Sequence, residues 1–136
     1  MKKQIKQKIN ITVIGLGYVG LPLALELSKN FKVSGFDTNK KRIKELNKSI
    51  DTTNEITKKS DLSNSNIKFT NNYLECKNSN IYIITVPTPV NKKNDPDLEN
   101  LKQASNLVAK IINKGDVIVI ESTVYPGVTE EVIAPI

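Results

Sequence analysis

Short apolar runs alternate along the chain with segments whose apolar residues recur at helical spacing. The runs predict strands at residues 9–14, 32–37, 67–70, 81–86 and 116–120. The helical spacing between these runs predicts five helices. The first ends at 29–30, the next two span 40–48 and 72–78, the fourth begins at 95–98 and the last begins at 129. Strands that alternate with helices predict an α/β fold, a doubly wound parallel sheet with right-handed crossovers.

Two connections carry less regular patterns. Residues 49–66 are polar and predict a long loop with one helical turn near 55–62. Asp95 is expected to cap the helix that follows it, with Pro96 in the first turn. The pattern supplies five strands and a last helix with nothing after it to return to a sheet. We therefore expect residues 1–136 to be one Rossmann-type domain, incomplete after the fifth strand and its helix.

The first strand runs directly into the spacing G-x-G-x-x-G, at Gly15, Gly17 and Gly20. A strand, a tight turn and a helix start in this order can receive a pyrophosphate on backbone N–H groups. Gly15 would allow the turn, Gly17 would leave the phosphates room, and Gly20 would let the helix pack closely on the sheet. Tyr18 and Val19 belong to the same turn, and Tyr18 is a further candidate cofactor contact.

Asp37 ends the second strand, twenty-two residues after Gly15. A Rossmann domain places there the acid that accepts hydrogen bonds from the adenosine ribose, and its charge would repel a 2′-phosphate, so NAD is favoured over NADP. The alternative is a helix cap or turn residue, a role that Thr38-Asn39 could also fill. Arg42 could pair with a phosphate, which weakens the choice of NAD, or lie flat against the adenine.

The fourth predicted strand breaks at Pro87-Thr88-Pro89. Two prolines make a rigid turn at the carboxyl end of a strand, which is the ligand-binding edge of such a sheet. The turn either simply ends the strand or lays Thr88 beside the dinucleotide.

Composition narrows the classes of function. The net charge of +6 comes from scattered lysines without interleaved aromatic residues, so nucleic-acid binding is not expected. The chain has no histidine, which excludes histidine-based catalysis or metal binding, and no metal site is expected. Its single cysteine, Cys76, is interpreted as a packing residue. No apolar run is long enough to span a bilayer and no signal peptide is evident, so a cytoplasmic protein is expected.

Four ordered segments together carry a resemblance. They are residues 14–24 (IGLGYVGLPLA), 36–39 (FDTN), 86–90 (VPTPV) with 96–98 (PDL), and 121–127 (ESTVYPG). In this order they resemble the UDP-glucose/GDP-mannose dehydrogenase family, the nucleotide-sugar 6-dehydrogenases, from about Lys8 onward. The first and last segments look closer to the branch that acts on UDP-N-acetylhexosamines (UDP-GlcNAc or UDP-GalNAc) in polysaccharide synthesis.

The resemblance implies oxidation of a sugar C6 alcohol to a carboxylate with two NAD, the second step through a cysteine thioester. It also implies a homodimeric or larger parent whose central domain and UDP-binding C-terminal domain, with the catalytic cysteine, are absent here. Val19 matches a pyrophosphate contact, Asp37 the ribose acid and Arg42 an adenosine contact. Thr88 and Thr123 match positions near the ribose and nicotinamide, and Pro87, beside Thr88, is a further candidate cofactor contact. Thr123 also matches a threonine that helps hold a catalytic water or the oxyanion, unless its hydroxyl only satisfies backbone at the strand end.

Two alternatives stay open: another NAD oxidoreductase with a Rossmann fold, and a non-catalytic module that binds NAD or a nucleotide. The turn at Thr88 and the segment 121–127 argue against the first. The open apolar sheet edge that a missing sixth strand would leave argues against the second.

Overall fold

The structure of the chain is a computed structural model that describes residues 8–56, 62–63, 66–90 and 95–136. Its strands are β1 (Asn10–Ile14), β2 (Lys32–Phe36), β3 (Ile67–Thr70), β4 (Ile81–Ile84) and β5 (Val117–Ile120). The helices are α1 (Gly20–Ser28), α2 (Lys40–Leu46) and α4 (Glu99–Ala109), with a 3₁₀ turn η1 (Tyr73–Cys76) and a π-helical turn η2 (Thr129–Ile133). Within these residues no helix has the length and apolar character needed to cross a bilayer.

The five strands form one parallel sheet in the order β3-β2-β1-β4-β5. The chain moves outward from β1 through β2 to β3, then crosses to β4 on the other side of β1 and continues to β5. This reversal is the switch point of a doubly wound sheet, where a crevice opens beyond the carboxyl ends of the central strands. The predicted α/β class is confirmed.

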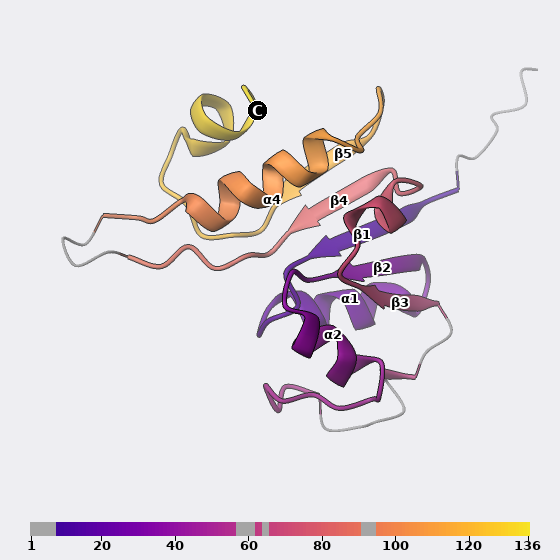
Figure 1. The fold of residues 1–136 in the computed structure, drawn as a ribbon. Helices are drawn as coiled ribbons and strands as arrows, with labels where there is room; N and C mark the ends of the chain where they lie inside the picture. The colour runs from indigo at the N-terminus through magenta and orange to yellow at the C-terminus, as the bar shows by residue number, and fades with distance from the viewer. Residues whose placement is uncertain (1–7, 57–61, 64–65, 91–94) are drawn as a thin grey trace, which may run out of the picture.

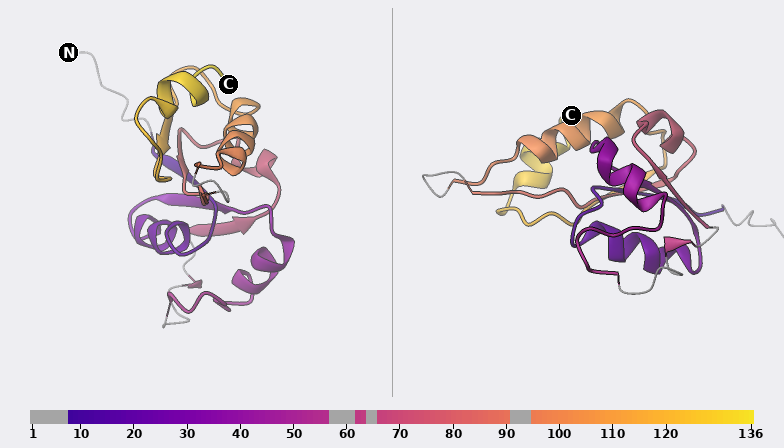
Figure 2. Two further views of the ribbon diagram at one scale, coloured as in Figure 1. Left: turned by 90° about the vertical axis from the view of Figure 1, so that its left-hand side faces the viewer. Right: turned by 60° about the horizontal axis from the view of Figure 1, so that its bottom comes forward.

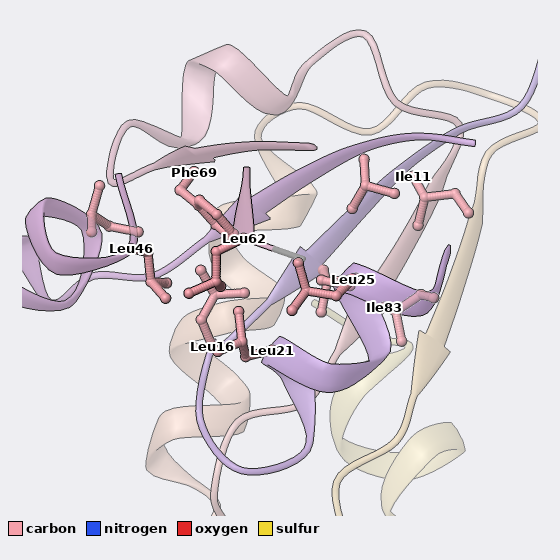
Figure 3. Close-up of a cluster of buried hydrophobic side chains, with 12 residues drawn as sticks. Ile11, Leu16, Leu21, Leu25, Leu46, Leu62, Phe69 and Ile83 are labelled. Carbon is pink, nitrogen blue, oxygen red and sulfur yellow. The ribbon is translucent and has the colours of Figure 1, made fainter. Parts of the chain in front are cut away.

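Two apolar cores cover the two faces of the sheet, and α1 and α4 lie on opposite sides of it (Figures 1 and 2). The first core joins the strands to α1 and α2; Figure 3 shows Leu46 and Phe69 at one end, Leu16 and Leu21 in the middle, and Ile83 at the other end. The second core packs η1, α4 and η2 against the other face around Tyr82, which is fully buried. β5 forms one edge of the sheet, and Val117 and Ile118 are 49% and 40% exposed there.

The prediction that Asp95 caps α4 is wrong. The helix begins at Glu99 with Leu98 in the cap position and no side-chain cap. Pro96 instead pairs with Val90 in an antiparallel bridge, and the Asp97 N–H donates to the Pro89 carbonyl at 2.7 Å. This short return toward the preceding loop occupies residues 96–97, so the helix starts later than the local pattern indicates.

Other boundaries differ by a few residues. The strand predicted at 81–86 ends at Ile84, and Thr85 and Val86 after it line the crevice. The helix predicted at 72–78 is the shorter 3₁₀ turn η1, capped by Asn72. Most of the helical turn predicted near 55–62 lies outside the described residues.

Candidate functional site

A crevice of about 950 Å³ opens at the carboxyl ends of β1, β2, β4 and β5. Eight of the ten residues predicted from the sequence to bind a cofactor line it: Gly15, Gly17, Tyr18, Val19, Asp37, Pro87, Thr88 and Thr123. Because the strands are adjacent in the order β2, β1, β4, β5, these residues follow one another across the crevice. Three strand spacings, roughly 14 Å, separate the end of β2 from the end of β5.

The glycine-rich turn forms one wall of the crevice. Gly15 has a φ of +93°, a conformation that L side chains rarely adopt, and its N–H donates to the Phe36 carbonyl. A Cβ at Gly17 would have no atom within 4 Å, so this glycine borders open space. The turn therefore presents bare backbone to the crevice at Gly17, as a close phosphate contact requires.

Gly20 is a different case, because it lies inside the protein rather than on the crevice wall. A Cβ there would lie 1.7 Å from the Gly15 carbonyl oxygen and 2.4 Å from Thr85 Oγ1. The third glycine thus lets α1 begin directly against the turn that precedes it.

The amino end of α1 faces the same crevice. Val19 occupies the cap position without a side-chain hydrogen bond, and the Leu21 N–H donates to the Gly17 carbonyl. The first N–H groups of a helix have no partners within the helix and carry partial positive charge. Tyr18 and Val19 are 69% and 60% exposed, so their side chains leave this end of the helix open to a ligand.

Asp37 makes the contacts of a turn residue and also lines the crevice. Its Oδ2 accepts from the Leu16 N–H at 2.9 Å, and its Oδ1 accepts from the Asn39 N–H at 2.8 Å. Asn39 is the residue that caps α2, through hydrogen bonds from the N–H groups of Lys41 and Arg42. Each carboxylate oxygen of Asp37 keeps a lone pair beyond these contacts, so the side chain can still accept from ribose hydroxyls in the crevice.

Arg42 does not line the crevice. Its side chain is 7% exposed, its Nε donates to the Leu16 carbonyl at 2.9 Å, and its NH1 group pairs with Asp51 at 2.8 Å. Asp51 also accepts from the Thr53 hydroxyl and from the N–H groups of Thr53, Glu55 and Ile56. The guanidinium is thus engaged inside the protein, behind the glycine-rich turn.

This environment sets the acidity of Asp51. Burial opposes ionisation of its carboxyl, but the hydrogen bonds from Thr53, Ile56 and Arg42 outweigh that effect and lower its pKa from 3.8 to about 2. The Arg42–Asp51 pair is therefore ionised at neutral pH and joins residues 51–56 to the back of the turn.

The loops after β4 and β5 are joined by two short hydrogen bonds. The Thr88 hydroxyl donates to the Thr123 carbonyl at 2.6 Å, and the Ser122 hydroxyl donates to the Val86 carbonyl at 2.6 Å. Thr88 Oγ1 keeps its acceptor lone pairs. The proline-bounded turn therefore does more than end a strand, because it holds Thr88 and Thr123 together in the crevice wall.

Sequence reasoning missed several polar residues that line the crevice. They are Thr85, Glu121, three residues of α4, namely Asn100, Gln103 and Asn106, and Lys110, which caps the carboxyl end of that helix. The spacing of three to four residues between the last three was a usable signal, because it places them on one helix face beside the buried stripe. Lys110 also lies over the Tyr73 ring, with its Nζ 5.9 Å from the ring centroid.

Cys76 lies in the core, as its interpretation as a packing residue requires. It is 2% exposed within the core of the opposite face, and burial raises the pKa of its thiol. Tyr82 packs in the same core, where burial raises its pKa to about 12 and its hydroxyl donates to the Ser79 carbonyl at 3.1 Å.

A parallel sheet with a glycine-rich turn, an acid after β2 and a crevice at the switch point defines a dinucleotide-binding domain. Residues 9–136 match the family described as "UDP-glucose/GDP-mannose dehydrogenase family, NAD binding domain". The chain belongs to this family, as the resemblance in its motifs predicted, and the domain that matches is the NAD-binding one.

Named relatives agree with the assignment. UDP-N-acetyl-D-glucosamine 6-dehydrogenase of Salmonella typhi is 50% identical over 129 residues, which are 95% of this chain and 30% of that protein. Among solved structures, UDP-D-ManNAc dehydrogenase from Pyrococcus horikoshii is 37% identical, with a TM-score of 0.84 over 90% of this chain and 30% of its own. A ternary complex of GDP-mannose dehydrogenase from Pseudomonas aeruginosa is 27% identical, with a TM-score of 0.85 over 92% and 31%. The chain spans about 30% of the length of the curated relatives it matches.

Proposed function

We propose that this chain is the NAD-binding part of a nucleotide-sugar 6-dehydrogenase that acts on a UDP-N-acetylhexosamine. One observation carries the cofactor assignment: Asp37, the open backbone at Gly17, Thr88 and Thr123 line a single crevice in this order. Such a row suits a ligand with two sugar ends joined by a pyrophosphate. The relative from Salmonella typhi, named for UDP-N-acetyl-D-glucosamine, supports the choice of sugar.

Each part of the crevice has a defined task in this proposal. Asp37 binds the adenosine ribose hydroxyls and disfavours a 2′-phosphate. Gly17 and the amino end of α1, with Val19 and Tyr18, bind the pyrophosphate, and the closely packed Gly15 and Gly20 shape the turn. Pro87, Thr88 and Thr123 border the nicotinamide end, where bound NAD supplies a hydride acceptor.

The overall reaction balances as an alcohol and water giving a carboxylate, with two hydrides passed to two NAD and three protons released. Within this chain Thr123 is the residue proposed to touch the reacting end, where its hydroxyl can donate to an oxyanion or hold a water. Its carbonyl is already held by Thr88 at 2.6 Å, so the backbone that carries this hydroxyl is fixed in place. Cys76 has no role in the chemistry, because it is buried in the second core and does not line the crevice.

The rest of the proposal concerns the whole protein. The sugar, the UDP-binding domain, the catalytic cysteine and a homodimeric or larger assembly belong to the longer parent, in the cytoplasm. For this chain, we expect NAD binding without oxidation of a UDP-sugar. For Arg42 the resemblance implies an adenosine contact. In the structure its side chain instead donates to the Leu16 carbonyl behind the glycine-rich turn.

Calorimetric titration of the purified chain with NAD and with NADP tests the cofactor assignment. Replacing Asp37 by Ala removes charge-assisted hydrogen bonds to the ribose, worth roughly 1.5–3 kcal/mol of binding free energy. We expect weaker NAD binding in Asp37→Ala and a smaller preference for NAD over NADP. Asp37→Asn is the matched control, since it keeps the size and one acceptor and removes the charge. Unchanged NAD affinity in Asp37→Ala would refute the ribose role. Turnover of UDP-GlcNAc by this chain alone would refute the proposal that it binds NAD without oxidising the sugar.

A further inference from the structure

Two successive peptide groups of the glycine-rich turn are held by hydrogen bonds to side chains. In the Gly15–Leu16 peptide, the carbonyl accepts from Thr85 Oγ1 at 2.8 Å and the N–H donates to Asp37 Oδ2 at 2.9 Å. In the Leu16–Gly17 peptide, the carbonyl accepts from Arg42 Nε at 2.9 Å. The Leu16 side chain between them is fully buried in the first core. These contacts therefore fix the backbone of the turn from Gly15 to Gly17.

The second of these peptides has one end that the protein leaves for a ligand. Within the described ranges, no hydrogen bond joins the Gly17 N–H to another group of the protein. The C=O and N–H of a trans peptide point in opposite directions, and the described chain has no cis peptide. A carbonyl drawn back toward Arg42 therefore turns the Gly17 N–H the other way, on the side where a Cβ would meet open space.

We infer that Arg42 is a positioning residue for the pyrophosphate of the cofactor: it holds the Leu16 carbonyl and thereby aims the Gly17 N–H into the crevice. The inference rests on the proposed NAD binding and assigns Arg42 a task other than the adenosine contact that the family resemblance implies. Asp51 completes the device. Its carboxylate is 1% exposed and accepts from the Arg42 NH1 group at 2.8 Å, so it holds the guanidinium where Nε reaches the Leu16 carbonyl.

A consequence is that residues far from the crevice contribute to cofactor affinity. The Arg42 NH1 and NH2 groups also donate to the hydroxyls of Thr52 and Thr53, both at 3.3 Å. The loop that carries Asp51 and these two threonines does not line the crevice within the described residues. It acts on the pyrophosphate only through the guanidinium and the Leu16 peptide.

A matched pair of variants isolates the contact to Leu16. In Arg42→Gln the side-chain N–H₂ falls at the position of the arginine Nε, so a donor to the Leu16 carbonyl is kept. In Arg42→Met a methyl group takes that position and the donor is lost. Both variants lose the charge and the ion pair with Asp51, so any difference between them reports the hydrogen bond to Leu16.

The assay is titration of each variant with NAD, by calorimetry and by following the Gly17 amide resonance in NMR spectra, with adenosine as the probe that lacks a pyrophosphate. We expect Arg42→Met to bind NAD roughly 10- to 100-fold more weakly than Arg42→Gln, the range expected when the hydrogen bond from the Gly17 N–H to the charged pyrophosphate is lost. The NAD-induced shift of the Gly17 resonance should shrink in Arg42→Met alone. Adenosine should shift the spectra of the two variants equally.

Three outcomes would overturn the inference. Equal NAD affinity in the two variants would show that the contact to Leu16 does not position the pyrophosphate. Equal loss of NAD and adenosine binding would return Arg42 to the adenosine contact. An unchanged NAD-induced shift of the Gly17 resonance in Arg42→Met would show that Arg42 does not position this amide. If Arg42→Met fails to fold, the same pair is compared in an Asp51→Asn background, which removes the unpaired buried carboxylate. Absence of NAD binding by the parent chain would instead refute the proposed function.

Discussion

Two glycines of the turn, Gly17 and Gly20, should respond very differently to the addition of one methyl group. Gly17→Ala places a Cβ in the open crevice, with no protein atom within 4 Å, whereas Gly20→Ala places it 1.7 Å from the Gly15 carbonyl oxygen. The two substitutions are chemically identical and lie three residues apart. Their comparison therefore separates the binding role of the turn from its structural role.

The magnitude for Gly20→Ala follows from the rigidity of what the methyl group meets. A contact of 1.7 Å cannot be relieved by a rotamer change, because the obstacle is backbone that Thr85 also holds. Overpacking costs about 1–3 kcal/mol and more where backbone must move, so we expect about 3 kcal/mol. Replacing a helical glycine by alanine returns up to about 1 kcal/mol. The net loss of roughly 2 kcal/mol lowers the melting temperature by several degrees in a domain of this size.

For Gly17→Ala we expect the reverse. The free energy of unfolding should stay within about 0.5 kcal/mol of the parent, as for other substitutions without contacts. NAD affinity should fall roughly 10- to 100-fold, because the methyl group keeps the pyrophosphate away from the N–H.

Thermal unfolding followed by circular dichroism measures the first quantity, and calorimetric titration with NAD measures the second. Adenosine serves as the control ligand for Gly17→Ala, since it makes no pyrophosphate contact and should bind as it does to the parent. Tight NAD binding by Gly17→Ala would refute the assignment of this backbone to the pyrophosphate. A Gly20→Ala variant as stable as the parent would refute the argument from close approach.

Three further predictions concern the surroundings of the site. Asp51 has a pKa lowered from 3.8 to about 2, so its contribution to stability, roughly 2 kcal/mol, is present above pH 4 and lost as the pH falls toward 2; urea unfolding across this range should show a slope that Asp51→Asn reduces. Thr88→Val removes the donor to the Thr123 carbonyl and should cost about 1 kcal/mol of unfolding free energy, whereas Thr88→Ser keeps the donor and should not; a Thr88→Val variant as stable as the parent would show that this hydrogen bond does not stabilise the loops. Cys76 should react with a thiol reagent only as fast as the protein opens, because the thiol is buried and its pKa is raised; rapid labelling of the native protein would contradict its place in the core.

The parts of the fold that depend on local pattern were predictable. The apolar run at 81–84 and the glycine turn after β1 indicate their structures from neighbouring residues alone, and the position of Asp37 follows from its distance along the chain to that turn. The start of α4 was not predictable in this way. Pro96 is a favourable first-turn residue, but its pairing with Val90 is a tertiary contact that overrides the local preference.

The candidate site shows the same limit. Most of its residues were found because they follow strands that end at one edge of the sheet. The contact between Arg42 and the Leu16 carbonyl spans twenty-six positions, and nothing near Arg42 in the sequence indicates it. The polar face of α4 was likewise indicated only by the spacing of its polar residues. That this face lines the crevice depends on the order of the strands, which places the helix beside it.

The exposed edge strand β5 has a consequence for work with this chain in solution. Val117 and Ile118 are about half exposed on a strand that pairs on one side with β4. Such an edge is a template for a strand from a neighbouring molecule. We expect the apparent molecular mass from light scattering to rise with protein concentration, and this rise to shrink when Ile118 is replaced by Lys. Ligand titrations are therefore best made at low protein concentration, where self-association through β5 does not disturb the measurement of affinity.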